Sequence, residues 1–336
     1  MKILVTGGSG FLGGAVCRLL AARGDEVVSL ARGEAPALAA LGVRHVLGDI
    51  TSLESVLEAS RGLDAVIHVA GKAGDWGTLE DFYAANVAGT DNVIAACFMN
   101  GIGRLVYTST PSVVHEGHDI EGGNESLPYA RRFSSPYPRT KALAEQRVLK
   151  ANGPDLATVA LRPHLIFGPG DRQLFPRIVA RRRAGRLRFI APGGKRIDVT
   201  YIDNAAQAHL DALDRLEPGA PPAGHAYFIS QGQPVVLEQM VNQLLQVAGL
   251  APEQRMLSQR NARLLAGLIE SVWRGLRLSS DPPLTRFLVE QLSTSHWYDI
   301  SAARRDLGYQ PRVTLGEGLA RLSEWWIREG RSPRAS

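Results

Sequence analysis

Tyr137 and Lys141 are the two residues of this sequence that most directly indicate catalysis. They are four positions apart in a segment predicted to be helical, Pro136–Ala151, so both side chains lie on one face, one turn apart. A phenol with a pKa of about 10 exchanges protons poorly at neutral pH unless a nearby cation stabilises its phenolate. The Lys141 ammonium, together with the positive charge of an oxidised cofactor, could supply that stabilisation. The pair therefore predicts acid–base catalysis, although the same spacing also occurs by chance on helix surfaces.

A run of hydroxyl side chains precedes this helix, at the end of the fifth predicted strand. Its members are Thr108, Ser109, Thr110 and Ser112. One such hydroxyl could hold a substrate carbonyl oxygen as a preorganised hydrogen-bond donor. Thr108 or Ser109 could instead do no more than satisfy backbone groups at the strand end. The run places a third candidate catalytic group beside the Tyr–Lys pair.

Three glycines near the start of the chain predict a dinucleotide site. An apolar strand, Lys2–Thr6, runs into Gly7-x-x-Gly10-x-x-Gly13 and then into a predicted helix, Phe11–Arg23. Gly7 permits a tight turn, Gly10 lets the backbone approach a pyrophosphate, and Gly13 allows close packing of helix against strand. The free N–H groups and positive dipole end of the helix would face the phosphates. A second predicted strand comes directly after this helix, as in a strand–helix–strand unit, which distinguishes the pattern from an ordinary glycine-rich turn.

The end of that second strand favours NADP over NAD. An NAD-binding protein normally has Asp or Glu here to accept a hydrogen bond from the ribose 2′-hydroxyl. In this chain Ala31 occupies the position and Arg32 follows it, where a guanidinium could pair with a 2′-phosphate. Glu34 is the nearest acidic residue and comes late. We therefore expect NADP, with NADPH as the hydride donor, and consider NAD the less favoured cofactor.

These candidate residues require a scaffold that brings strand ends together. Strand and helix patterns alternate through the first half of the chain, which predicts an α/β fold with a doubly wound parallel Rossmann sheet. The expected strands are Lys2–Thr6, Glu26–Ala31, Arg44–Leu47, Ala65–Ala70, Arg104–Ser109 and Thr158–Arg162. The expected helices are Phe11–Arg23, Ser52–Ser60, Leu79–Asn100 and Pro136–Ala151.

After Gly168-Pro169-Gly170 the alternation gives way to shorter elements. We expect several helices there, and strands at Leu187–Ile190, Val199–Ile202 and Ala226–Ser230. The chain is therefore predicted to consist of a dinucleotide-binding Rossmann core, residues 1–168, and a smaller mixed substrate lobe, residues 169–330. The lobe is expected to interleave with the end of the sheet.

Composition excludes several functions. The 336 residues carry a net charge of +5, but the basic residues are dispersed, and the dense run 177–188 is interpreted as the solvated face of a helix leading into a strand. Without interleaved aromatic residues it does not predict nucleic-acid binding. Cys17 and Cys97 specify neither a disulfide framework nor a metal site, which fits a reducing cytoplasm. We expect no signal peptide, because a strand starts at residue 2, and no membrane span, because no uncharged apolar stretch reaches about 18 residues.

Residues Thr6–Gly13 match the TGxxGxxG signature of the extended short-chain dehydrogenase/reductases, and the chain resembles that family. The resemblance implies that Thr110 is the catalytic hydroxyl, with Ser112 in reserve, and that Lys141 also hydrogen-bonds the nicotinamide ribose. It implies that Asp49 binds the adenine amino group, although Asp49 could instead cap the following helix. The cofactor-binding residues expected on this basis are Gly7, Ser9, Gly10, Phe11, Leu12, Gly13, Arg32, Asp49, Ile50, Ala70, Tyr137, Lys141, Pro163 and Ile166.

Longer segments narrow the resemblance to the branch that contains 3β-hydroxysteroid and sterol-4-carboxylate dehydrogenases. They are Tyr107–Val113, Leu161–Asp171, Val199–Ala208 and Trp297–Pro311. Within the branch, the TSTPSV run, Pro283–Leu292 and His296-Trp297-Tyr298 resemble bacterial 2-alkyl-3-oxoalkanoate reductases of long-chain olefin synthesis. Those enzymes reduce a β-keto acid to a β-hydroxy acid, whereas sterol-4-carboxylate dehydrogenases oxidise a β-hydroxy acid to a β-keto acid that loses carbon dioxide.

Either substrate requires an apolar cleft and a cation for its carboxylate. Lys72, Arg172 and Arg196 are unranked candidates, and His164 is a further one, although a histidine at a strand end is more often structural. The amphipathic segment Asn261–Leu278 has three open interpretations. It could be a helix packed on the substrate lobe, a lid over a long alkyl chain, or a patch that contacts a membrane or a pathway enzyme.

Two rival functions have different requirements. A sugar-nucleotide epimerase or dehydratase would need retained NAD and a nucleotide pocket, which Ala31 and the apolar helix oppose. A non-enzymatic dinucleotide sensor would normally lack the Tyr–Lys pair. We therefore expect a cytoplasmic, homo-oligomeric oxidoreductase that acts on a small long-chain acyl or sterol-like molecule. Asn86 is expected to brace strands and not to contact the ligand.

Overall fold

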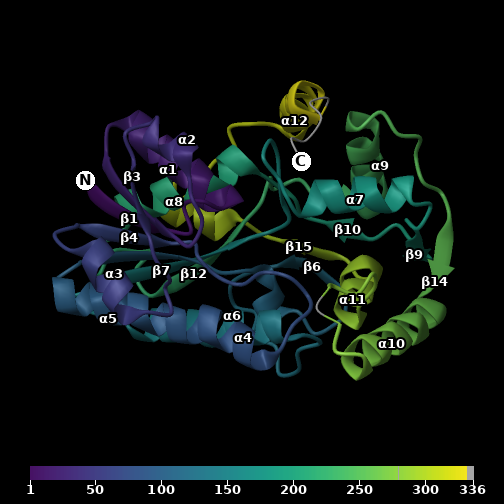
Figure 1. Ribbon diagram of the computed structural model, residues 1–336, viewed down its shortest axis with the longest axis horizontal. Helices are drawn as coiled ribbons and strands as arrows, with labels where there is room; N and C mark the ends of the chain where they lie inside the picture. The colour runs from purple at the N-terminus through teal and green to yellow at the C-terminus, as the bar shows by residue number, and fades with distance from the viewer. Residues whose placement is uncertain (279, 331–336) are drawn as a thin grey trace.

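A seven-stranded parallel sheet forms the centre of the protein in a computed structural model that describes residues 1–278 and 280–330 (Figure 1). The strand order is β12-β7-β5-β4-β1-β2-β3. The strands are β1 (Lys2–Thr6), β2 (Glu26–Ala31), β3 (Arg44–Leu47), β4 (Ala65–His68), β5 (Arg104–Thr108), β7 (Ala157–Pro163) and β12 (His225–Ile229). Their near-continuous apolar runs are buried because helices cover both faces of the sheet.

Helices lie on both faces of this sheet, as predicted (Figure 1). On one face are α1 (Phe11–Arg23), α2 (Pro36–Ala39) and α8 (Ile202–Arg215). On the other are α3 (Leu53–Ser60), α4 (Leu79–Tyr83), α5 (Gly89–Asn100) and α6 (Pro136–Lys150). The strand order reverses between β1 and β4, and in such sheets ligands bind in the crevice outside the carboxyl ends of the strands at that point.

One predicted helix differs from expectation. Instead of a single helix over Leu79–Asn100, the chain forms α4, a π-helical turn η1 (Ala84–Ala88) and α5. The wider turn carries Asn86, whose side chain bonds the backbone of the loop after β4. Single π-turns of this kind are frequent beside functional sites.

The remaining elements lie outside the central sheet and the helices named above. A mixed sheet has the order β13-β10-β15-β6, and two short ladders pair β8 with β11 and β9 with β14. These strands are β6 (Ile120–Gly123), β8 (Ile166–Phe167), β9 (Phe189–Ala191), β10 (Arg196–Ile197), β11 (Thr200–Tyr201), β13 (Val235–Val236), β14 (Met256–Ser258) and β15 (His296–Tyr298). The helices are η2 (Pro111–Val114), α7 (Leu174–Arg183), α9 (Leu237–Val247), α10 (Gln259–Gly275), α11 (Arg286–Ser293), η3 (Ala303–Leu307) and α12 (Leu315–Gly330).

The later strands were predicted less accurately than the early ones. The strand expected at Leu187–Ile190 is β9, shifted by one to two residues, and Ile202 begins α8 and does not end a strand. The strand expected at Ala226–Ser230 is β12, which joins the main sheet beside β7. The division at residue 168 stays a prediction. Two elements that follow it in the sequence, α8 and β12, pack against elements that precede it. None of the helices within the described ranges is long and apolar enough to cross a membrane.

Candidate active site

A single cleft of about 1840 Å³ opens at the carboxyl ends of the central strands. Thr110 and all fourteen residues predicted to contact the cofactor line it. They come from segments far apart in the chain, which the parallel sheet brings to one edge. The sheet therefore assembles the predicted set of residues in one place, while their individual roles stay predictions.

The glycine loop leaves no room for side chains at two of its positions. A Cβ on Gly7, whose φ is +75°, would lie 3.0 Å from the Ala70 backbone, and a Cβ on Gly13 would lie 2.2 Å from the Gly7 carbonyl oxygen. Gly10 is the N-cap of α1 and has no side chain to occupy the free N–H groups of the first turn. The residues of this turn, Phe11, Leu12 and Gly13, line the cleft, and free N–H groups at a helix N-terminus suit a pyrophosphate. A dinucleotide fits the geometry of this loop.

The other end of the cofactor region holds the residues that bear on NADP choice. Arg32 is highly exposed, and its Nη1 lies 4.0 Å from Asp49 Oδ2. Asp49 does not cap α3, because Ser52 does so by accepting the Ser55 N–H at 3.2 Å. Asp49 instead accepts the Thr51 N–H at 2.9 Å, and the remaining carboxylate oxygen stays at the cleft.

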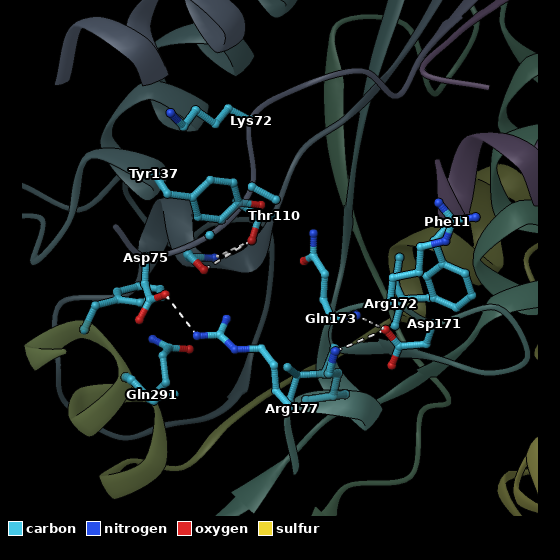
Figure 2. A pocket seen from close by; sticks show the side chains of 18 of the residues that line it. Phe11, Lys72, Asp75, Thr110, Tyr137, Asp171, Arg172, Gln173, Arg177 and Gln291 are labelled. Atoms are coloured by element: carbon cyan, nitrogen blue, oxygen red, sulfur yellow. Dashed lines mark hydrogen bonds and ion pairs between the residues drawn. The ribbon is translucent and has the colours of Figure 1, made fainter. Parts of the chain in front are cut away.

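Tyr137 and Thr110 face the cleft from neighbouring elements (Figure 2). Tyr137 lies in the first turn of α6, and Thr110 is the N-cap of η2. The Thr110 hydroxyl accepts the Ser112 N–H at 3.3 Å and donates to Ser112 Oγ at 3.2 Å. Burial raises the pKa of the Tyr137 phenol, and a hydrogen bond with Thr110 offsets only part of that rise. The phenol is therefore protonated at neutral pH and able to donate a proton.

Lys141 is buried one turn further along α6, where it is 5% exposed. Its Nζ donates to the Thr108 carbonyl oxygen at 2.5 Å and lies 4.2 Å from the centre of the Tyr107 ring. Burial lowers the pKa of Lys141 to about 7, and the Glu145 carboxylate opposes this only in part. The sequence predicted that Lys141, together with an oxidised nicotinamide, lowers the pKa of Tyr137, and this stays a prediction. In the protein chain alone burial raises that pKa, and the hydrogen bond with Thr110 lowers it only in part.

Second contacts hold this region in shape. Asn86 accepts the Lys72 N–H at 2.7 Å and donates to the Lys72 carbonyl and to Thr140 Oγ1, both at 3.0 Å. Asn86 therefore joins the loop after β4 to α6. The sequence predicted that Asn86 would brace strands, whereas it braces this loop and this helix. The Thr108 hydroxyl is taken by His209 at 2.8 Å, whereas Ser109 Oγ has no hydrogen-bond partner among the described residues.

His164 offers no free N–H to a carboxylate. Its Nδ1 lies 2.7 Å from the Asp198 carbonyl oxygen, and its Nε2 lies 2.8 Å from His296 Nδ1. Burial and the neighbouring His296 both lower the pKa of His164 well below the usual value. His164 is a buried structural residue at the wall of the cleft, which was the alternative considered for it.

The cations that line the cleft are only partly those that the sequence predicted. Lys72 and Arg172 line it, but Lys72 is paired with Asp81 at 3.2 Å. Arg196 is exposed on β10, outside the cleft, so its candidacy is wrong. The sequence missed Arg177 and Arg181, since the run 177–188 was interpreted as a solvated face. Their i, i+4 spacing was the available signal, because it places them on one side of α7.

The far end of the cleft is predominantly apolar. Side chains from β9, β14, α9, α10 and α11 form its walls. They include Phe189, Ile190, Leu237, Met240, Leu244, Leu257, Leu265, Ile269, Leu284, Phe287, Leu288 and Leu292. Such a chamber, continuous with the cofactor end, can hold a hydrophobic substrate against a polar reactive group.

A Rossmann cleft with this arrangement defines an NAD(P)-dependent oxidoreductase of the extended short-chain dehydrogenase/reductase class, acting on a CH–OH group. The profile of the 3-beta hydroxysteroid dehydrogenase/isomerase family matches residues 4–259, and the chain belongs to this family.

Curated relatives support the narrower resemblance. A 2-alkyl-3-oxoalkanoate reductase from Stenotrophomonas maltophilia is 54% identical over 96% of this chain and 98% of its own length. One of the same name from Shewanella oneidensis is 46% identical over 95% of this chain and 84% of its own. A 3-beta-hydroxysteroid dehydrogenase from Mycolicibacterium neoaurum is 34% identical over 95% of this chain and 89% of its own.

Solved structures share the fold. The crystal structure of gox2253 has a TM-score of 0.79 and 25% identity over 99% of both chains. A structure of MoeE5 in complex with UDP-glucose and NAD has a TM-score of 0.76 and 24% identity, covering 98% of this chain and 99% of its own. At this identity the likeness establishes the architecture and does not identify a substrate.

Proposed function

We propose that the protein is an NADP-dependent oxidoreductase that interconverts a 2-alkyl-3-oxo acid and its 2-alkyl-3-hydroxy acid, as in long-chain olefin synthesis. The observation that carries this proposal is one continuous cleft. It joins the glycine loop, through Thr110, Tyr137 and Lys141, to an apolar chamber. The relatives named 2-alkyl-3-oxoalkanoate reductase, at 54% and 46% identity, support this substrate class.

The chain's own residues would handle the proton and the substrate oxygen. The Tyr137 hydroxyl donates its proton to the oxygen during reduction and accepts it during oxidation. The Thr110 hydroxyl holds the same oxygen, and the Lys141 ammonium stabilises the phenolate left on Tyr137. A nicotinamide, when bound, supplies or accepts the hydride. The raised pKa of Tyr137 suits the reductive direction, because the phenol begins protonated.

NADP is the proposed cofactor because of Arg32. This arginine is exposed at the cofactor end of the cleft, and among the described residues its ion pair is a 4.0 Å contact with Asp49. Its guanidinium is therefore available to a 2′-phosphate, a group that arginine binds with charge-assisted, often bidentate hydrogen bonds. Ala31 offers no carboxylate to a 2′-hydroxyl.

The direct test is an oxidation assay. A β-keto acid loses carbon dioxide spontaneously, so a 2-alkyl-3-hydroxy acid is offered with NADP and the formation of NADPH is followed. We expect turnover that increases with the length of the alkyl chains. A preference for 3β-hydroxysteroids over every such acid would overturn the proposal.

A steroid or sterol-4-carboxylate dehydrogenase is the second candidate. It is favoured by relatives such as the human sterol-4-alpha-carboxylate 3-dehydrogenase, decarboxylating, which is 35% identical over 95% of this chain and 87% of its own length. The same assay separates the two, since it offers a steroid and an alkyl hydroxy acid side by side.

We also propose that the outer face of α10 contacts a membrane surface or a pathway enzyme. Ala262 and Ala266 are buried, whereas Leu264, Leu268 and Leu276 are 65%, 64% and 68% exposed. Binding to anionic vesicles, measured by flotation and abolished by Leu268→Glu, would identify a membrane; binding unchanged by that variant would contradict this role. A homo-oligomer in the cytoplasm stays a prediction, to be checked by light scattering and fractionation.

A further inference from the structure

We infer that Arg177 and Arg181, on α7, form the site that binds the substrate carboxylate, and that Asp75 positions the Arg177 guanidinium for it. The inference rests on the proposed function and adds the residues that select an acid over an uncharged alcohol. Neither arginine is among the cations that the sequence suggested.

Arg177 lies where a substrate carboxylate would need a partner. Its side chain reaches from α7 into the space that Thr110 and Tyr137 also face, beside Asp75 and Gln291 (Figure 2). The Arg177 side chain is 43% exposed, and its Nη2 lies 3.7 Å from Asp75 Oδ1, beyond hydrogen-bond distance. The guanidinium is therefore positioned by Asp75 but keeps its N–H donors for another oxygen anion.

Among the described residues, Arg181 forms no ion pair of its own, whereas its neighbour Arg177 pairs with Asp75. Arg181 lines the cleft one turn along α7, and its Nη2 donates to the Pro283 carbonyl oxygen at 2.8 Å. Burial and the neighbouring Arg177 lower the pKa of Arg181, while Asp75 raises it. Two guanidiniums thus share one carboxylate, and a second carboxylate would balance them.

The other acidic groups of the cleft are already engaged. Asp81 pairs with Lys72, and Asp49 faces Arg32 at the cofactor end. Asp171 accepts three backbone N–H groups at the start of α7, at 2.7–3.1 Å. None of these can neutralise the arginine pair, so a substrate anion is the group that completes it.

Asp75 also connects the two sides of the cleft. Thr285, the N-cap of α11, donates its hydroxyl to Asp75 Oδ2 at 2.5 Å, and Arg274 lies 5.4 Å from the centre of the adjacent Trp76 ring. The loop after β4 therefore contacts both α10 and α11. A carboxylate next to Arg177 would sit between this loop and the apolar chamber, with its alkyl chains directed into the chamber.

The test separates this inference from the proposed reaction by using a ligand that cannot react. 2-Hexyldecanoic acid has a carboxyl group and two alkyl chains but no hydroxyl to oxidise, and its methyl ester lacks only the charge. Binding of both to the full chain with NADP is measured by calorimetry for the parent, Arg177→Gln and Arg183→Gln. Arg183 is the matched control, because it is exposed on the same helix and lies outside the cleft lining.

We expect Arg177→Gln to weaken binding of the acid roughly 10- to 100-fold and to leave the ester unchanged, since a charge-assisted contact is lost. Arg183→Gln should change neither, and Asp75→Asn should weaken binding of the acid less than Arg177→Gln does, because it removes the group that positions Arg177 but keeps the guanidinium. Equal loss for acid and ester, or no loss for either, would overturn the inference. If the parent binds the acid through Arg177 but oxidises no 2-alkyl-3-hydroxy acid, the proposed function fails and the carboxylate site stands.

Discussion

The walls at the two ends of the cleft differ: backbone atoms dominate at the cofactor end and side chains at the substrate end. At the cofactor end, backbone atoms approach one another so closely that Gly7 and Gly13 have no room for a side chain. At the substrate end, long side chains from several helices form the wall. One of these helices, α10, carries Gly267 outside the cleft lining, with open space where a Cβ would be. Fixed backbone can bind a cofactor of constant shape, whereas side chains that can repack suit a substrate with variable alkyl chains.

The largest expected effect lies where the two ends meet. Tyr137→Phe removes only the oxygen that transfers the proton, so turnover should fall about 10²- to 10⁴-fold while cofactor affinity stays unchanged. Steady-state rates and NADPH titration measure the two quantities. Tyr83→Phe, outside the cleft lining, is the control. Turnover within threefold of the parent would show that Tyr137 is not the acid.

Lys141 makes the same junction sensitive to pH. Its pKa is lowered to about 7 in the folded chain, from 10.5 in the unfolded one. Between these values the unfolded chain binds more protons, so the free energy of unfolding should rise with pH. In denaturant titrations the parent should gain up to about 4 kcal/mol relative to Lys141→Met between pH 7 and pH 10. Parallel curves for the two proteins would contradict the lowered pKa of the buried Lys141.

A glycine-to-alanine substitution in the glycine loop is compared with the same substitution in α10, the helix beside the apolar chamber. Gly13→Ala puts a Cβ 2.2 Å from the Gly7 carbonyl oxygen and should destabilise the fold by about 1–3 kcal/mol and weaken cofactor binding. Gly267→Ala, in the helix interior of α10, should stabilise it by about 0.5–1 kcal/mol. Thermal unfolding with and without NADPH measures both. Equal effects of the two changes would remove the distinction between the ends.

Cofactor preference tests the cofactor end alone. Ala31→Asp with Arg32→Ser should lower the preference for NADP over NAD roughly tenfold or more, because a charge-assisted contact is lost and a partner for the 2′-hydroxyl is added. The ratio of kcat/KM values for the two cofactors is the measurement. A parent protein that binds NADH more tightly than NADPH would refute the assignment without any variant.

The smallest effect is expected at the substrate end, one methylene at a time. Each buried methylene adds at most about 0.8 kcal/mol, so kcat/KM should rise no more than about fourfold per carbon of the alkyl chain. Leu284→Ala, in the chamber wall, should flatten this dependence. A rate independent of chain length in the parent would mean that the chamber does not hold the alkyl chains.

The same contrast explains what the sequence could predict. The bounds of β1, α1, β2 and β3 were predicted to the residue, since Gly7-x-x-Gly10-x-x-Gly13 and short apolar runs are local signals. The carboxylate site was not predicted, because Arg177 acquires its role from Asp75, a residue about a hundred positions earlier. The rise in the pKa of Tyr137 in the protein chain alone was not predicted for a related reason, since burial depends on neighbours that spacing does not reveal.

The position of β12 has a consequence for how the protein is made. Until residues 225–229 have left the ribosome, β7 is an open edge whose residues are all buried in the finished protein, the kind of surface on which unfinished chains aggregate. A fragment ending near residue 168 would keep that edge permanently, and would also lack α8, which packs on α1. The cofactor half therefore completes its own folding only after much of the substrate half has been synthesised.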